Sequence, residues 1–208
     1  PSDHRAVVSD FVVEPAAMPE VVSTSRRVYS DGDGIDISYN VPRGESRLIS
    51  VMNSDTGDFV VAAKPVEANG KLRLGPSVFG PGRYAARMTH PNGSGALVRD
   101  FWVLASDAVP AVQVSDDTFG KGETIGITWS NAPGNRNDYV AIFRAGVLPT
   151  SEEILAWAYI EAAASGETLL DFSGRQNAPL DPGRYVVRLM KDDGYEPLAT
   201  SPVFVVEP

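Results

Sequence analysis

The 208-residue sequence contains no cysteine and only two histidines. The absence of cysteine excludes disulfide bonds, thiolate metal sites and a cysteine nucleophile. A zinc site needs three or four nitrogen, sulfur or oxygen ligands, and His4 and His90 lie far apart in the chain, so no such site is expected. No nucleophile-elbow sequence accompanies either histidine, which argues against a serine hydrolase triad. His90 precedes Pro91-Asn92-Gly93 and is expected in a surface turn.

The sequence also lacks long apolar runs and blocks of basic residues. No run approaches the length of a transmembrane helix, so no transmembrane segment is expected. Without a Lys/Arg block, docking on anionic lipid is not predicted either. The 27 acidic residues outnumber the 18 basic ones, which gives a net charge of -9. An acidic surface repels phosphate backbones, so direct binding of nucleic acid is not expected. The composition leaves the cellular compartment open.

What the sequence does contain is a succession of short alternating segments separated by turn residues. The 19 glycines and 16 prolines are spread along the chain, which is typical of many turns between short strands. Ile35, Ile37 and Tyr39 alternate with polar residues after Asp31-Gly32-Asp33-Gly34, and Asn69-Gly70 marks a tight turn. About seven such strands in each half predict an all-β fold of two tandem immunoglobulin-like β-sandwiches.

An internal repeat supports two similar units. The segment Gly80-Pro81-Gly82-Arg83-Tyr84 is matched by Asp181-Pro182-Gly183-Arg184-Tyr185, so that the two tyrosines are 101 residues apart. We expect a remnant strand at residues 1–14, a linker at 15–19, the first sandwich at 20–105, a linker at 106–110 and the second sandwich at 111–207. Thr150-Ser151-Glu152-Glu153 has the form of a capping box and predicts one or two helical turns before a strand at 158–160.

The first residues carry the most specific motif. Asp3 and His4 precede an alternating apolar run, and a carboxylate beside an imidazole can orient it for proton transfer. Ser2-Asp3-His4 followed by this run resembles the last strand of the endonuclease/exonuclease/phosphatase family of DNase I-like, metal-dependent phosphoesterases. The resemblance covers about fourteen residues. It implies that the chain is the C-terminal part of a hydrolase whose catalytic domain lies upstream.

The family resemblance assigns roles to these two residues only in the full-length parent enzyme. His4 would act on the scissile phosphate or the attacking water, and Asp3 would orient it or help with the metal. Mg²⁺ is expected for the parent, whereas no cofactor and no metal ligands are expected for this fragment. Without the parent sheet, residues 1–14 should be disordered or should pair with an exposed sheet edge.

A second resemblance concerns residues 110–207. The segment from Trp129 to Phe143, together with Trp157, Tyr159, Tyr185 and the Asp193-Gly194-Tyr195 turn, resembles SKICH-type immunoglobulin-like domains. The sequence departs from that pattern at Tyr139 and Ala141, where SKICH domains carry Trp and Gly. In eukaryotes SKICH domains accompany inositol-phosphatase catalytic domains of the same phosphoesterase family. The resemblance implies a targeting or interaction role rather than chemistry.

Several aromatic residues and two Asp-Gly segments are expected to have structural roles. Trp129, Phe143, Trp157 and Tyr185 are expected in the sandwich core, because aromatic residues at alternating strand positions dominate such cores. Tyr195 lies in a turn and is the better candidate for the surface. Asp31-Gly32-Asp33-Gly34 and Asp192-Asp193-Gly194 lack the further ligands of an EF-hand, so hairpin turns are expected there. A looser calcium site between loops stays open.

The sequence therefore predicts non-catalytic accessory domains at the C-terminus of a metal-dependent phosphoesterase. Their role would be targeting or interaction, with the upstream catalytic domain as one partner and a protein, lipid or glycan as a further ligand. The alternative is a free-standing adhesion module that binds carbohydrate or protein. The fragment itself is not expected to be an enzyme, because no complete catalytic set is present.

Overall fold

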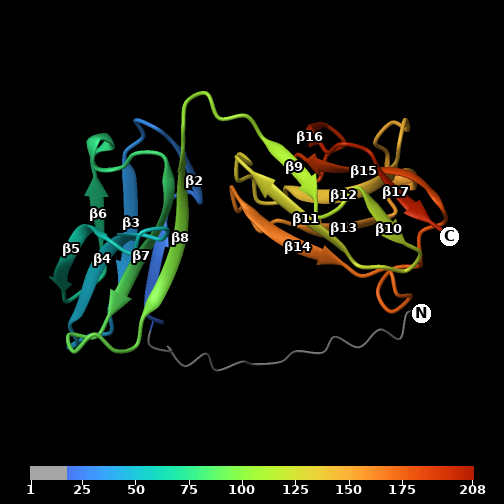
Figure 1. Ribbon diagram of the computed structural model, residues 1–208. Helices are drawn as coiled ribbons and strands as arrows, with labels where there is room; N and C mark the ends of the chain where they lie inside the picture. The colour runs from blue at the N-terminus through green and yellow to red at the C-terminus, as the bar shows by residue number, and fades with distance from the viewer. Residues whose placement is uncertain (1–17) are drawn as a thin grey trace, which may run out of the picture.

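The computed structural model describes residues 18–208, which fold into two β-sandwiches joined by a short connection (Figure 1). The strand expected at residues 1–14, with Asp3 and His4, lies outside the described residues. So does most of the linker expected at 15–19. Within residues 18–208, no helix has the length and hydropathy needed to cross a membrane.

The first sandwich consists of a three-stranded and a five-stranded sheet. The smaller sheet has the order β1 (Val21–Thr24), β3 (Ile35–Asn40) and β6 (Gly70–Leu74). The larger sheet has the order β2 (Val28–Ser30), β8 (Leu97–Leu104), β7 (Gly82–Thr89), β4 (Arg47–Asn53) and β5 (Phe59–Val66). Neighbouring strands are antiparallel except β2 and β8, which are parallel. A single 3-10 turn, η1 (Pro76–Val78), precedes β7.

The second sandwich repeats this order. Its smaller sheet contains β14 (Gly166–Leu170), β11 (Ile125–Ser130) and β9 (Ala111–Val114). Its larger sheet contains β10 (Thr118–Gly120), β17 (Phe204–Glu207), β15 (Gly183–Met190), β12 (Tyr139–Arg144) and β13 (Ala156–Tyr159), with β16 (Pro197–Thr200) also paired to β15. Here β10 and β17 are the parallel pair. The fold class is therefore as predicted, all-β with two tandem immunoglobulin-like sandwiches.

The repeated tyrosines make the same contact in both sandwiches. Tyr84 Oη donates a hydrogen bond to the Gly80 carbonyl at 2.8 Å, and Tyr185 Oη donates one to the Asp181 carbonyl at 2.6 Å. Each tyrosine ring also lies against a phenylalanine of the last strand, Phe101 at 5.5 Å or Phe204 at 5.8 Å between ring centroids. This bond from the start of a strand back to the preceding corner is the tyrosine corner of immunoglobulin-like domains.

The cores confirm two of the four aromatic predictions. Trp129 and Tyr185 are buried in the sandwich core. Phe143 is buried, but in a separate cluster on the outer face of the larger sheet. The fourth residue, Trp157, lies on the same outer face and is 51% exposed. The reason lies in the register, which places Trp157 opposite Ala141 on the outer face of the larger sheet. Its neighbours Ala156 and Ala158 contribute to the main core instead. Side chains alternate between faces along a strand, so a core position for Ala156 excludes one for Trp157.

The capping-box prediction is confirmed for the helical turn but is wrong for the cap itself. Thr150 precedes a single 3-10 turn, η2 (Ser151–Glu153), but its side chain makes no cap hydrogen bond. The following strand, β13, begins at Ala156 rather than at residue 158. The segment before it covers the outer face of β12, where Ala145, Val147 and Ile154 pack on Phe143 and Met190. Packing of this segment on the outer face, rather than helix propensity, determines its conformation.

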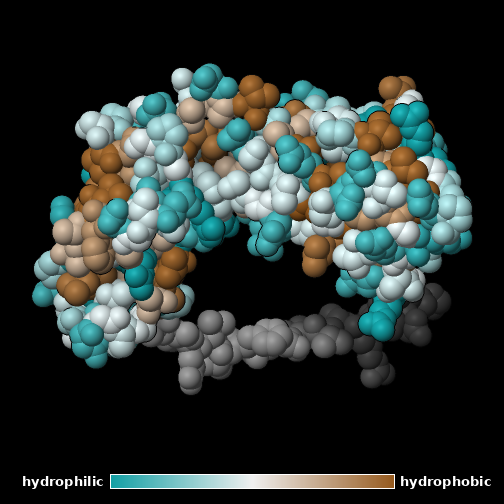
Figure 2. All heavy atoms as spheres, viewed as in Figure 1, coloured by the Kyte–Doolittle hydropathy of each residue, from teal (hydrophilic) through white to brown (hydrophobic). Residues whose placement is uncertain are grey.

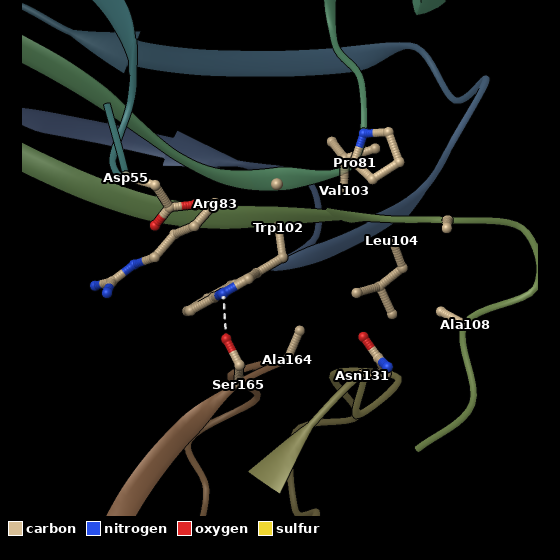
Figure 3. A pocket seen from close by; sticks show the side chains of 12 residues that line it. Asp55, Pro81, Arg83, Trp102, Val103, Leu104, Ala108, Asn131, Ala164 and Ser165 are labelled. Carbon is tan, nitrogen blue, oxygen red and sulfur yellow. Dashed lines mark hydrogen bonds between the residues drawn. The ribbon is translucent and has the colours of Figure 1, made fainter. Parts of the chain in front are cut away.

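The two sandwiches contact each other directly. Val28 and Trp102 of the first sandwich are buried in a small apolar cluster with Ala164 of the second. Trp102 extends from β8 toward the second sandwich, and its indole Nε1 donates a hydrogen bond to Ser165 Oγ at 3.1 Å (Figure 3). On the visible face, hydrophobic and hydrophilic side chains are interspersed over both sandwiches (Figure 2).

Candidate functional site

An aromatic pocket lies on the outer face of the second sandwich. We define the aromatic pocket by its lining residues, which are Tyr139, Ile154, Trp157, Tyr159, Asp193 and Tyr195. They come from β12, from β13 with the segment before it, and from the turn between β15 and β16. The cavity measures about 150 Å³, the size of a single side chain or small headgroup rather than of an extended ligand.

The rings of the pocket stand roughly at right angles to one another. Trp157 and Tyr159 are in edge-to-face contact, with centroids 4.8 Å apart and planes at 77°. Tyr139 meets Trp157 at 76° and Tyr159 at 81°. Edge-to-face packing places the positive edge of one ring on the negative face of another, so the exposed rings hold each other in position. Trp157, Tyr159 and Tyr195 are each about half exposed, which leaves ring surface free for a ligand.

A carboxylate is fixed at the rim of this pocket. Asp193 Oδ1 accepts a hydrogen bond from Tyr159 Oη at 2.7 Å. Tyr139 Oη donates to the Gly194 carbonyl at 3.0 Å, which ties the same turn to β12. Of the described residues, no Lys, Arg or His lines the pocket. The site therefore combines aromatic faces with a single negative charge.

The turn that carries Asp193 is held by a buried carboxylate. Asp192 and Asp193 both have positive φ, 44° and 59°, which is an uncommon backbone conformation for residues other than glycine. Asp138 is fully buried, and its Oδ1 accepts a hydrogen bond from the Asp192 N–H at 3.0 Å. The Asp193 N–H donates to the Asn137 carbonyl at 3.1 Å. These bonds maintain the strained turn, and such strain is typical of functional loops.

The pKa values of two pocket tyrosines are shifted upward. Burial raises the pKa of Tyr139, and the negative charge of Asp193 adds to the effect. The pKa of Tyr159 is raised chiefly by its hydrogen bond to Asp193, which favours the neutral phenol. Both hydroxyls are therefore protonated at neutral pH, and Asp193 is the source of negative charge in the pocket.

The strand beneath the pocket is the edge of its sheet. Within residues 18–208, β13 pairs with β12 on one side and with no strand on the other. The Ile160 N–H donates to the Asp138 carbonyl at 3.0 Å, which makes these two residues a hydrogen-bonded pair of the ladder. Hydrogen-bonded and non-bonded pairs alternate along an antiparallel ladder, so Trp157 and Tyr159 direct their backbone N–H and C=O groups away from β12.

The sequence-predicted candidates fall in different places. Asp3 and His4 lie outside the described residues. His90 lies in a surface turn as predicted, with Gly93 N–H donating to its carbonyl at 2.8 Å. Asp33 lies in a turn, where its Oδ2 accepts a hydrogen bond from the Ser30 N–H at 2.9 Å, but the hairpin predicted there is wrong, because β2 and β3 belong to different sheets. Within residues 18–208, no group of three or more His, Cys, Asp or Glu side chains is arranged to hold a metal ion.

The prediction for Tyr195 is confirmed, since this residue is on the surface and lines the pocket. Sequence reasoning missed Trp157 and Tyr159 as surface residues. The available signal was the alternation of Ala156 and Ala158 with the two aromatic residues. Two small residues on one face and two large ones on the other are compatible with an edge strand that turns its aromatic face outward.

Comparisons with known proteins identify no family for this chain. No family model and no curated protein matches it. Among solved structures, it is similar to a chain described as the BSP domain of a biofilm-associated protein, with 16% identity and a TM-score of 0.34 over 89% of this chain and 29% of that one. A Dpr2 Ig1-Ig2 complex with DIP-Theta Ig1-Ig3 gives 10% identity and a TM-score of 0.37, covering 90% of this chain and 65% of that one.

A chimeric titin Z1Z2 structure gives 15% identity and a TM-score of 0.29, over 92% of this chain and all of that one. The chain thus spans less than a third of the biofilm-associated protein chain that it matches. At these values the similarities carry no argument about function, which we derive from the side chains described above.

Proposed function

We propose that this chain is a non-catalytic interaction module that binds a protein partner at the aromatic pocket and the adjoining edge of β13. The observation that carries the proposal is the combination of half-exposed Trp157 and Tyr159 with an open strand edge at the same residues. An extended polypeptide can add to such an edge through backbone hydrogen bonds, while pockets beside the strand select its side chains.

The charge of the site favours a basic side chain as the group that enters the pocket. Arg or Lys is attracted to the faces of Trp and Tyr rings by cation–π interaction. Asp193 adds a carboxylate at the rim, and the chain as a whole carries a net charge of -9. An acidic ligand would be repelled by the same groups. The ligand we expect is an extended segment with one Arg or Lys side chain in the pocket.

A glycan is the competing ligand, because aromatic faces and a carboxylate also suit sugar rings and hydroxyls. The outward-directed backbone groups of Trp157 and Tyr159 favour the polypeptide, because a sugar does not supply a matching row of backbone donors and acceptors. The two kinds of ligand should differ in whether their binding requires a positive charge on the ligand. Replacing the basic residue of a peptide by Gln should abolish its binding, whereas binding of a neutral oligosaccharide would not depend on any cation.

The test is a titration of the intact chain with short extended peptides that differ only in a central Arg, Lys or Gln, monitored by tryptophan fluorescence and calorimetry. We expect the Arg and Lys peptides to bind and Trp157→Ala to weaken their binding by about tenfold or more. Phe59→Ala is the matched control, since Phe59 is an exposed aromatic residue on the edge strand β5 of the first sandwich. Binding of neutral oligosaccharides without binding of the peptides would establish the glycan alternative instead.

We further propose that the module belongs to a Mg²⁺-dependent phosphoesterase, for which it would serve as a C-terminal accessory region. The support is the resemblance of Ser2-Asp3-His4 to the final strand of that family. The test is phosphodiesterase activity with Mg²⁺, measured side by side on this chain and on the product of the full-length gene. Activity in the full-length product alone is expected, and activity in neither would refute the assignment.

A further inference from the structure

Four arginines line a second cavity, at the junction of the two sandwiches. We define the junction cavity by Arg26, Arg27 and Arg99 of the first sandwich and by Arg136 with the Pro133–Asn135 segment and the Glu161–Ala162 turn of the second. Its volume is about 600 Å³. Glu161 supplies the one carboxylate in the lining formed by the described residues. A concentration of positive charge is unexpected in a chain with a net charge of -9.

Most of these arginines have no carboxylate partner. Arg26 pairs with Asp33 at 3.4 Å, but within residues 18–208 Arg27, Arg99 and Arg136 form no ion pair. Arg27 donates one hydrogen bond, from Nη1 to the Glu161 carbonyl at 3.3 Å. The Nε atoms of Arg27 and Arg99 are buried and have no hydrogen-bond partner among the described residues. A buried donor on a charged group is costly when it is left without an acceptor.

The electrostatic environment of Arg27 also indicates that the cavity lacks negative charge. The pKa of Arg27 is lowered, first by burial and then by the positive charge of Arg99. A negatively charged ligand near Arg27 and Arg99 would offset this unfavourable interaction. The negative charges of Asp100 and Glu161 offset this effect only in part, because the pKa of Arg27 stays below its ordinary value.

We propose that the junction cavity binds an oxyanion, a phosphate or sulfate group, held by Arg27 and Arg99 from one sandwich and by Arg136 from the other. The planar guanidinium presents its donors in a fork that matches the oxygens of such groups. The anion would accept hydrogen bonds from the guanidinium groups that line the cavity and would neutralise the repulsion between the arginines. The proposal is independent of the ligand of the aromatic pocket.

The cavity is assembled from parts that depend on close approach of the two sandwiches. A Cβ on Gly134 would lie 2.3 Å from Val28 Cγ2, so only glycine allows this segment to reach the first sandwich. Glu161 and Ala162 both have positive φ, 53° and 58°, in the turn whose carbonyl accepts from Arg27. Such a conformation in two consecutive residues other than glycine costs free energy, and this cost is often retained at binding sites. An anion bridging both sides would also hold the two sandwiches together.

The experiment is calorimetric titration of the intact chain with inorganic phosphate, with sulfate and with methyl phosphate, each at constant ionic strength maintained with chloride. We expect saturable binding with one site per chain, and the relative affinities of the three probes distinguish the phosphate, sulfate and phosphoester sources. Arg27→Gln and Arg99→Gln should each weaken binding by about tenfold, the effect of losing one charge-assisted hydrogen bond.

Arg136→Gln separates an effect on binding from an effect on folding. Arg136 is exposed and contributes to no core cluster, so its replacement should leave the protein folded. It should also weaken the binding. Arg184→Gln is the control, since Arg184 is exposed on β15 and lies outside the cavity. Absence of saturable binding to all three probes would overturn the proposal. So would an equal loss of affinity in the Arg184 variant, which would indicate non-specific attraction.

Discussion

Tyr159 Oη and Asp193 Oδ1 are joined by a 2.7 Å hydrogen bond across the mouth of the aromatic pocket. This bond couples the outward face of β13 to the turn between β15 and β16. It fixes the ring of Tyr159 and the position of the carboxylate at the same time.

The first prediction concerns the titration of Tyr159. Asp193→Asn removes the negative charge that favours the neutral phenol, so the pKa of Tyr159 should fall toward its ordinary value. The shift is upward in the folded protein. Its contribution to stability is therefore present below the ordinary tyrosine pKa and is lost as the pH rises through the raised value. Ultraviolet absorbance of tyrosinate during an alkaline titration measures the change.

Asp107→Asn is the control for this titration, because Asp107 is exposed in the connection between the sandwiches. It should leave the tyrosine titration unchanged. If Asp193→Asn gave a titration curve identical to that of the wild type, the bond would have no role in setting the pKa of Tyr159.

The second prediction concerns Asp138, the buried carboxylate beneath the pocket. It accepts hydrogen bonds from the Asn135 N–H, from Asn135 Nδ2 and from the Asp192 N–H, each at 3.0 Å. Asp138→Ala leaves these donors without their acceptor and should lower the free energy of unfolding by about 3 kcal/mol. Urea denaturation measures the loss. Asp171→Ala should cost much less, because Asp171 accepts its backbone bond at an exposed turn.

Asp138→Ala should also reduce peptide binding more than Asp171→Ala does, since the turn that presents Asp193 depends on Asp138. A variant with full affinity for the basic peptides would show that Asp138 serves stability alone.

The third prediction concerns a glycine paired with a tryptophan. Gly166 lies directly opposite Trp129 on the neighbouring strand, and a Cβ on Gly166 would approach Trp129 Cζ2 to 2.6 Å. Trp129 cannot easily move, because it is buried and its Nε1 donates to the Ala163 carbonyl at 3.1 Å. Gly166→Ala should therefore lower the free energy of unfolding by about 2 kcal/mol through overpacking.

Gly75→Ala is the matched control for overpacking, because a Cβ there meets no atom within 4 Å. It should change the stability by only a few tenths of a kcal/mol. Thermal unfolding of both variants makes the comparison, and an equal effect at the two positions would contradict the role assigned to Trp129.

The fourth prediction concerns the contact between the sandwiches. Trp102→Ala removes a side chain that is only 5% exposed, together with its hydrogen bond to Ser165. The two sandwiches should then sample a wider range of orientations, which small-angle scattering detects as a larger mean radius of gyration. Val205→Ala, at the corresponding strand position of the second sandwich, should leave the scattering unchanged. An unaltered profile in the Trp102 variant would mean that other contacts hold the pair.

The sequence was sufficient for those parts of the fold that depend on local signals. The turn residues and the alternation around Ile35 and Ile37 predicted the strands, and the repeated Tyr84 and Tyr185 predicted two similar sandwiches. The prediction of core residues failed at Trp157 and Phe143, because the face of the sheet on which a side chain lies is determined by the register of its strand. The alternation of aromatic and small residues in the sequence is the same whichever face of the sheet the aromatic side chains occupy.

The junction cavity could not be predicted, because its arginines are distant in the chain. Arg27, Arg99 and Arg136 come together only when β2, β8 and the segment before β12 meet across two sandwiches. In the sequence, each of these arginines by itself predicts only a solvent-exposed surface residue. No sequence pattern predicts the unpaired Nε atoms or the positive φ angles of Glu161 and Ala162.

The parallel pair formed by β2 and β8 corresponds to the pair formed by β10 and β17, but the residues at its first position differ. Val28 faces Trp102 in the first copy, whereas Thr118 faces Val205 in the second. The first pair is buried against the neighbouring sandwich, and the second pair remains exposed. The same strand position therefore contacts the neighbouring sandwich in one copy and lies on open surface in the other. The two copies differ at this position although both keep the same tyrosine corner.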